Sequence, residues 1–144
     1  MNKMKLLRIN TDSLKYQASI NKVRAFTIDE TLFEEFVSNP NNLAYAVLED
    51  EEVVAFAWGY LLERMDDAPM LYIHSVDVLE GYRQKGYGRV LMDAFLTYAR
   101  EQHVRNTFLI TDKENIAANK LYQKYASEME EDKVLYIFKE EVDT

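Results

Sequence analysis

Three of the four glycines of this chain, Gly81, Gly86 and Gly88, fall within eight residues. They stand between an apolar, strand-like run over residues 71–78 and a helix-like run over residues 90–100. A glycine-bearing turn between a strand and a helix leaves backbone N–H groups unpaired where the helix starts. Those groups and the positive end of the helix dipole suit a phosphate. The stretch therefore predicts an α/β fold with an anion site at the end of a strand.

Positive side chains strengthen this prediction. Arg83, Lys85 and Arg89 lie in or beside the turn, and no acidic residue stands between Gly81 and Asp93. The stretch is not a P-loop, because no Gly-Lys-Ser/Thr follows. It also lacks the acidic residue about 20 positions later that a dinucleotide fingerprint needs. Such glycines also occur in ordinary turns, but their place between a strand and a helix favours a phosphate or pyrophosphate.

Apolar periodicity along the chain predicts elements in the order β-α-α-β-β-β-α-β-α-β. The predicted strands cover residues 5–9, 43–48, 53–62, 70–78, 106–111 and 134–138, and a further short strand is placed near Met129. The predicted helices cover residues 14–23, 27–37, 90–100 and 112–125. The strand over 53–62 is apolar on both faces, which is typical of a covered central strand. Interleaved strands and helices predict an α/β (α+β) fold, a mixed central sheet with helices on both faces, as one domain over residues 1–144.

Composition narrows the class of protein. The chain has no cysteine, which excludes disulfides and thiolate catalysis, and its two histidines are too far apart for metal-ligand spacing, so we expect no metal. Its net charge of -8 argues against nucleic-acid binding and is compatible with a cationic substrate. No apolar run is long enough for a membrane span or a signal peptide, so we expect a cytoplasmic protein without membrane contact.

A second motif lies in the last predicted helix, where Asn115, Ala118 and Tyr122 fall on related turns. Together, Arg83-x-x-Gly86-x-Gly88 and Asn115-x-x-Ala118-x-x-Leu121-Tyr122 resemble the GNAT superfamily of acetyl-CoA-dependent N-acetyltransferases. The predicted order of elements is similar to that fold across nearly the whole chain. The resemblance implies an enzyme with acetyl-CoA as co-substrate and an amine as acceptor.

The resemblance also implies which residues hold acetyl-CoA. The turn would grip the pyrophosphate through the backbone N–H groups of Gln84, Lys85, Gly86, Tyr87, Gly88 and Arg89. Backbone groups of Val76 and Val78 would pair with the pantetheine arm, and the N–H of Val78 would polarise the acetyl carbonyl. Asn115 would contact the pantetheine, and Tyr122 would protonate the departing thiolate.

Direct transfer to an amine calls for a general base, and His74 is the candidate. By strand alternation it is expected to share a face with Val76 and Val78. Histidine is the side chain that titrates nearest to neutral pH, which suits this role. A half-buried histidine without a chemical role is an equal alternative, and Tyr72, Glu80 or a water chain could act instead.

The acceptor is the least determined part of the interpretation. Acidic residues in the loops over 65–70 and 128–133 would suit a polyamine or an aminoglycoside, while peptide N-termini and lysine side chains stay open. The helix after Tyr122 lacks the glycine that usually ends it in this family, so the geometry of the chain beyond it is not predicted. Family likeness also suggests a homodimer through the C-terminal strand. Two alternatives remain: a GNAT-fold module that senses acyl-CoA without turnover, and an unrelated nucleotide-binding α/β domain.

Overall fold

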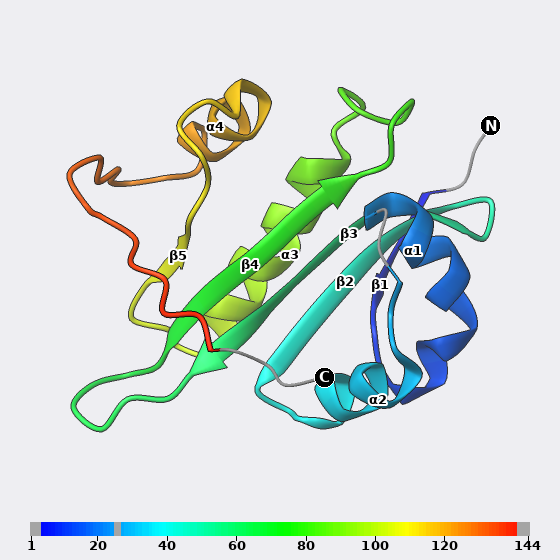
Figure 1. Cartoon of the computed structure of the whole chain (residues 1–144), viewed down its shortest axis with the longest axis horizontal. Helices are drawn as coiled ribbons and strands as arrows, with labels where there is room; N and C mark the ends of the chain where they lie inside the picture. The colour runs from blue at the N-terminus through cyan, green and yellow to red at the C-terminus, as the bar shows by residue number, and fades with distance from the viewer. Residues whose placement is uncertain (1–3, 25–26, 141–144) are drawn as a thin grey trace. The chain divides into compact units, whose positions relative to one another are not determined.

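The computed structural model describes residues 4–24 and 27–140, and the chain divides into two compact units, Met1–Ile110 and Thr111–Thr144 (Figure 1). The strands are β1 (Met4–Arg8), β2 (Asn42–Glu49), β3 (Glu52–Leu62), β4 (Met70–Val78) and β5 (Thr107–Leu109). The helices of the first unit are the 3-10 helix η1 (Thr11–Tyr16) and the α-helices α1 (Gln17–Arg24), α2 (Glu30–Ser38) and α3 (Tyr87–Glu101). The second unit contains α4 (Ile116–Gln123).

The five strands form one sheet in the order β1-β2-β3-β4-β5. Every neighbouring pair is antiparallel except β4 and β5, which are parallel. The tight turn between β2 and β3 holds Asp50 and Glu51 at φ of 52° and 67°. Two consecutive residues with positive φ are what a two-residue hairpin loop of type I′ requires. The mixed sheet confirms the predicted fold class, and β2 and β3 form an antiparallel hairpin where strands over 43–48 and 53–62 were predicted.

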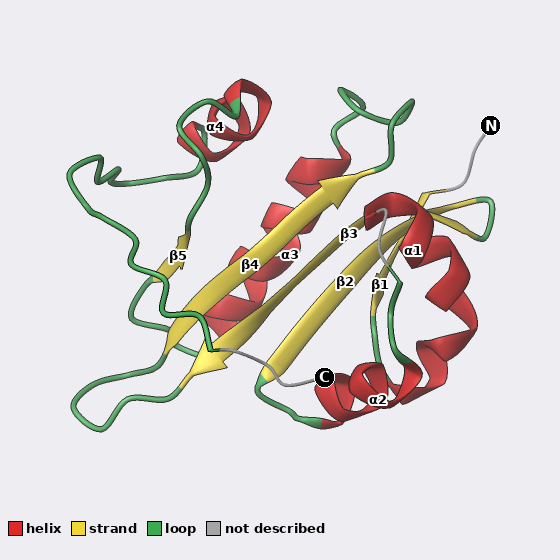
Figure 2. Ribbon diagram, viewed as in Figure 1, coloured by secondary structure: helices red, strands yellow, loops and turns green. Residues whose placement is uncertain are grey.

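Helices cover both faces of this sheet, with α1 and α2 on one side and α3 on the other (Figure 2). Phe36 of α2 packs edge-on against Trp58 of β3, and Phe95 of α3 packs edge-on against Tyr45 of β2. The core between the sheet and the first two helices consists of Ile9, Ile20, Phe33, Ala44, Ala46, Leu48, Val53 and Phe56. Because both faces are covered, residues 53–57 of β3 are buried, as predicted for a central strand.

Local signals set the helix ends. Asp29 caps α2 by accepting the N–H of Leu32 at 3.0 Å, and Asn115 caps α4 by accepting the N–H of Ala118 at 3.1 Å. A capping side chain satisfies a backbone donor that the helix itself cannot pair. The cap at Asn115 explains why α4 begins at Ile116, later than the predicted start at 112.

The predicted strand over 134–138 is wrong, as is the short strand near Met129. Residues 127–140 contain no strand, and the side chains from Val134 to Phe138 are between 66% and 89% exposed. The apolar pattern alone does not make a strand, because its backbone groups also need a hydrogen-bonding neighbour. β5 is likewise shorter than the predicted strand over 106–111. No helix within 4–24 and 27–140 is both long and apolar enough to span a membrane.

Candidate active site

β4 has two neighbouring strands only over its first half. β5 pairs with Leu71, Tyr72 and Ile73, whereas β3 follows β4 as far as Val78. From His74 onward, the side of β4 that faces β5 has no strand partner in the described sheet (Figure 2). An unpaired backbone edge can accept an extended ligand as if it were a further strand.

A β-bulge at His74 separates the two halves of β4. Gly59 of β3 pairs with Ile73 and the adjacent Trp58 pairs with Ser75, so His74 has no partner on β3. A bulge inserts one extra residue into a strand. As a result, the residues after His74 turn their backbone groups in the opposite sense to those before it.

The backbone hydrogen bonds on either side of the bulge show this reversal. Before the bulge, Leu71 donates its N–H toward β5, at 3.0 Å. After it, Leu79 donates to the carbonyl of Val54 in β3, at 2.8 Å. Since backbone groups alternate along a strand, Val76 and Val78 direct their N–H and C=O groups to the unpaired edge.

Arg83 folds back onto this edge. Its Nε donates to the carbonyl oxygen of Val78 at 3.2 Å, which agrees with that carbonyl facing away from β3. Lys85 lies beside it in the turn, with its Nζ 5.0 Å from the centre of the Tyr82 ring. Both cations therefore stay at the junction between β4 and the turn.

The turn itself is shaped by left-handed residues. Gly81, Gln84 and Gly86 have φ of 92°, 64° and 87°. α3 starts at Tyr87, and Gly86 precedes it with no side chain capping the helix. The first N–H groups of an α-helix, here from Tyr87, Gly88 and Arg89, have no acceptor within the helix. A Cβ at Gly81 or Gly86 would meet no atom within 4 Å, so the space before the turn is open to a ligand.

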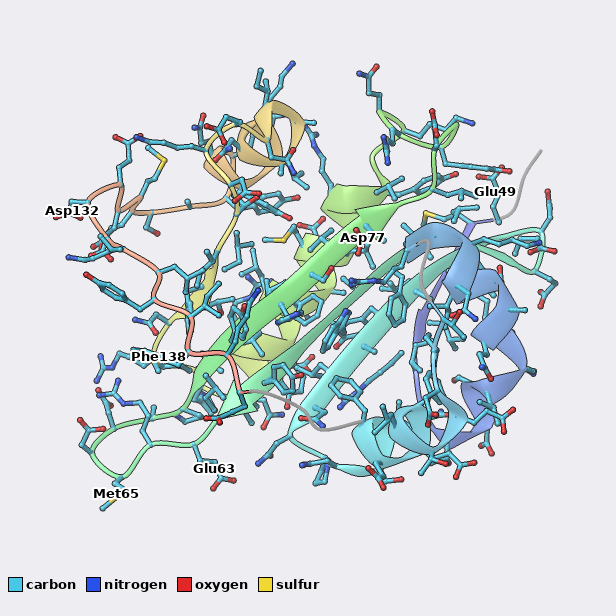
Figure 3. The ribbon with its side chains drawn as sticks, in the orientation of Figure 1. Glu49, Glu63, Met65, Asp77, Asp132 and Phe138 are labelled. Atoms are coloured by element: carbon cyan, nitrogen blue, oxygen red, sulfur yellow. The ribbon has the colours of Figure 1, made fainter. Side chains whose placement is uncertain are left out.

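A buried acidic residue, Glu49, binds Tyr87 at the start of α3. Glu49 lies at the end of β2 (Figure 3) and is only 6% exposed. The hydroxyl of Tyr87 donates to its carboxylate. This hydrogen bond, with burial and the negative charge of Glu49 adding to it, raises the pKa of Tyr87 to about 12. This contact could not be predicted, because the two residues are 38 positions apart and no local pattern connects them.

The bulge also decides the direction of the His74 side chain. The ring of His74 lies 4.2 Å from that of Trp58, on the face covered by α1 and α2. Asp77 lies on the same face, because it binds α1. Its neighbours Val76 and Val78 must then point to the opposite face. The expectation that His74 shares a face with these valines is therefore wrong, since strand alternation does not hold across a bulge.

Arg24, at the end of α1, joins that helix to β4. Its Nη1 lies 3.1 Å from Oδ2 of Asp77 and also donates to the hydroxyl of Ser75, which in turn donates to Asp77 at 2.7 Å. The guanidinium stands 5.7 Å from the centre of the Trp58 ring. The one sequence feature that could have indicated this network is Asp77, a single acidic residue within an otherwise apolar strand.

Asn115 and Tyr122 lie in the second unit. The side chain of Asn115 is engaged as the helix cap, and Tyr122 is half-buried in the last turn of α4, where its carbonyl accepts the N–H of Ala126 at 2.9 Å. Their roles toward a ligand on β4 stay predictions. Within the described residues, no three His, Asp or Glu side chains form a group that could hold a metal.

A comparison with models of protein families shows to which family the chain belongs. The model described as the acetyltransferase (GNAT) family matches residues 9–126. This chain belongs to the GNAT acetyltransferase family. The resemblance predicted from the two sequence motifs is confirmed. A comparison of this GNAT chain with curated proteins finds no match.

Solved structures share the GNAT fold over nearly the whole chain. The aminoglycoside acetyltransferase meta-AAC0020, from an uncultured soil metagenomic sample, has a TM-score of 0.87 and 21% identity, over 96% of this chain and 97% of its own. The aminoglycoside N-acetyltransferase AAC(6')-Iy, in complex with CoA, has a TM-score of 0.81 and 18% identity, over 96% of each chain. The ribosomal-protein-alanine N-acetyltransferase of Brucella melitensis biovar Abortus 2308 has a TM-score of 0.74 and 16% identity, over 95% and 99%. At these identities the likeness shows the fold.

Proposed function

We propose that this chain transfers the acetyl group of acetyl-CoA directly to a primary amine of a small-molecule or peptidic acceptor. The observation that carries the proposal is an unpaired strand edge that runs into an open, uncapped glycine turn. The amides of a pantetheine arm can pair with the backbone groups of Val76 and Val78 along that edge. The N–H groups at the start of α3 then suit the pyrophosphate. The complex of AAC(6')-Iy with CoA supports acetyl-CoA as the co-substrate.

In the proposed reaction, the neutral amine attacks the thioester carbonyl and a C–N bond forms. The oxygen that becomes negative accepts a hydrogen bond from the backbone N–H of Val78, which favours the transition state. The C–S bond then breaks, and Tyr122 donates a proton to the departing thiolate. The amine proton passes to His74 or to water. No covalent enzyme intermediate is required, which fits a chain without cysteine.

Two variants test acetyl-CoA binding and turnover, and each adds one negative charge at a different position of α3. We expect Gly88→Asp, in the first turn of α3, to abolish the heat of CoA binding, because its carboxylate repels the pyrophosphate. The substitution should not unfold the helix, since acids are favourable in the first helical turn. The matched control is Thr97→Asp, which adds the same charge at an exposed position further along α3 and should bind CoA normally.

The chemistry is measured as thiol release from acetyl-CoA over a panel of amines. Release with at least one amine, lost in Gly88→Asp and kept in Thr97→Asp, is the expected result. CoA binding without release on any amine would instead support a module that senses acyl-CoA. Tighter binding of ATP or NAD than of CoA would support a nucleotide-binding domain and would contradict the proposal.

A further inference from the structure

Five rings from three adjacent strands form a continuous surface on the face of the sheet that α1 and α2 partly cover. We call this surface the aromatic wall; it consists of Trp58, Tyr60, Tyr72, His74 and Phe108. Tyr72 stacks on Phe108 with ring centres 5.1 Å apart and lies edge-on to His74 at 5.6 Å. His74 lies 4.2 Å from Trp58, and Tyr60 stacks along Tyr72 at 6.3 Å.

The aromatic wall is not an ordinary part of the core. Phe36 of α2 packs against Trp58 and Tyr60, which covers one end of the wall. The other end is open: His74 is exposed and Phe108 is 39% exposed. Aromatic rings that are packed on one side and exposed on the other offer a surface on which a planar group can stack.

The open end of the wall borders the edge at which the thioester would lie. His74 is the bulge residue, where the pairing of β4 with β5 has just ended. Four residues of strand separate it from Val78, about 13 Å. The hydrogen bond from the N–H of Val78 to the acetyl oxygen covers about 3 Å of this distance, and the approach of the amine to the carbonyl carbon covers about 3 Å more. A ring resting beside His74 can therefore carry an amine to the reactive carbonyl on a short alkyl arm.

The charges around the wall do not suit a polycation. Asp77, on the same face of the sheet as His74, is bonded to Arg24. In the loop after β3, Asp66 pairs with Arg64 and Asp67 pairs with Arg105, each at 2.8 Å. The acids from which the sequence predicted a polyamine or aminoglycoside pocket in that loop are thus already neutralised. Burial raises the pKa of Tyr60, with Tyr72 adding to the shift, which favours the neutral phenol in this part of the wall.

We propose that the acceptor is a compact monoamine with a planar aromatic group on a short alkyl arm, stacked on the aromatic wall. This inference rests on the proposed acetyl transfer and names the acceptor class of that site. This acceptor class differs from the aminoglycosides after which the acetyltransferases of the same fold are named. The inference also assigns Tyr72, His74 and Phe108 as residues that determine acceptor specificity.

The test compares kcat/KM for thiol release among amines that differ in one property. Tryptamine and 2-phenylethylamine carry the planar ring, 2-cyclohexylethylamine has the same arm without a planar ring, and spermidine and sisomicin are polycations. We expect the two aromatic amines to exceed each of the other three at least tenfold. A larger kcat/KM for spermidine or sisomicin, or no difference between the phenyl and cyclohexyl amines, would overturn the inference and leave acetyl transfer standing.

A pair of variants locates the effect on the wall. Phe108→Leu keeps an apolar side chain but removes a ring, and Tyr136→Leu removes a ring that is 76% exposed and outside the wall. The readout is the ratio of kcat/KM for tryptamine to that for spermidine within each variant, because this ratio does not depend on the folded fraction. We expect a fall of about tenfold in Phe108→Leu and no change in Tyr136→Leu; an unchanged ratio in Phe108→Leu would overturn the proposal. Absence of CoA binding and of thiol release on every amine would refute the underlying function as well.

Discussion

The close approach of β3 to β4 at Gly59 makes a sharp prediction about the bulge. A Cβ at this position would lie 2.2 Å from the carbonyl oxygen of Tyr72 and 3.1 Å from Cα of Ile73. Both are backbone atoms, so rotation of a side chain cannot relieve the contact. Gly59→Ala must therefore push the two strands apart where the bulge begins.

The magnitude follows from the distances. Reaching ordinary contact requires a movement of about 1 Å, and overpacking of this kind costs about 1–3 kcal/mol. The movement also weakens ladder hydrogen bonds beside the bulge, each worth about 1 kcal/mol. We expect a loss of about 3 kcal/mol in the free energy of unfolding. For a chain of this size that lowers Tm by roughly 10 °C.

Gly86→Ala is the matched control for thermal and urea unfolding. Gly86 has φ of 87°, but its added Cβ would meet no atom within 4 Å. Its cost is then the left-handed backbone alone, about 1–2 kcal/mol. Gly59→Ala should lose more stability, whereas Gly86→Ala should lose more CoA affinity, because it lies in the turn. If Gly59→Ala melts within 2 °C of the wild type, or above Gly86→Ala, the argument from close approach is refuted.

Three further substitutions address single groups. The folded-state pKa of Tyr87 lies above its ordinary value of 10.0, so its bond to Glu49 stabilises the fold fully below pH 10 and is lost as pH rises through about 12. Tyr87→Phe should therefore lower Tm by a few degrees at pH 8, with the difference from wild type shrinking in melts at pH 11 and above. Tyr122→Phe should lower kcat by roughly ten- to a thousand-fold with acetyl-CoA binding unchanged, and wild-type turnover would make this residue structural. His74→Ala should lower kcat and remove the acid limb of the pH–rate profile; an unchanged profile would exclude it as the base.

Much of the fold could be predicted because its signals are local. The apolar run over 70–78 has the bounds of β4, and the three glycines after it mark the turn into α3. The second helix, predicted over residues 27–37, begins after Asp29, which caps it within three residues. Each of these features depends on residues within a few positions of one another, which is the range over which a sequence pattern carries information.

The features that could not be predicted depend on pairs of distant residues. Arg24 and Ser75 are 51 positions apart, and nothing near either one indicates the other. The strand over 134–138 was predicted from its apolar pattern, but pairing also requires a neighbour, and the pattern contains no information about one. The bulge depends on a glycine in a different strand, because only Gly59 leaves room for the Tyr72 carbonyl.

Because of the bulge, the two substrates of the proposed reaction can contact different groups of β4: acetyl-CoA its backbone edge, and the amine acceptor its side chains. Without the extra residue, the backbone groups of Val76 and Val78 would point at β3 and pair with it, and those of Ser75 and Asp77 would face the unpaired edge instead. With the extra residue, the backbone of Val76 and Val78 faces the unpaired edge, while His74 and Asp77 face the side of α1. One strand can then hold the acyl donor through its backbone and the acceptor through its side chains. An acceptor that requires the aromatic wall, and a donor that requires only the backbone edge, are what this division predicts.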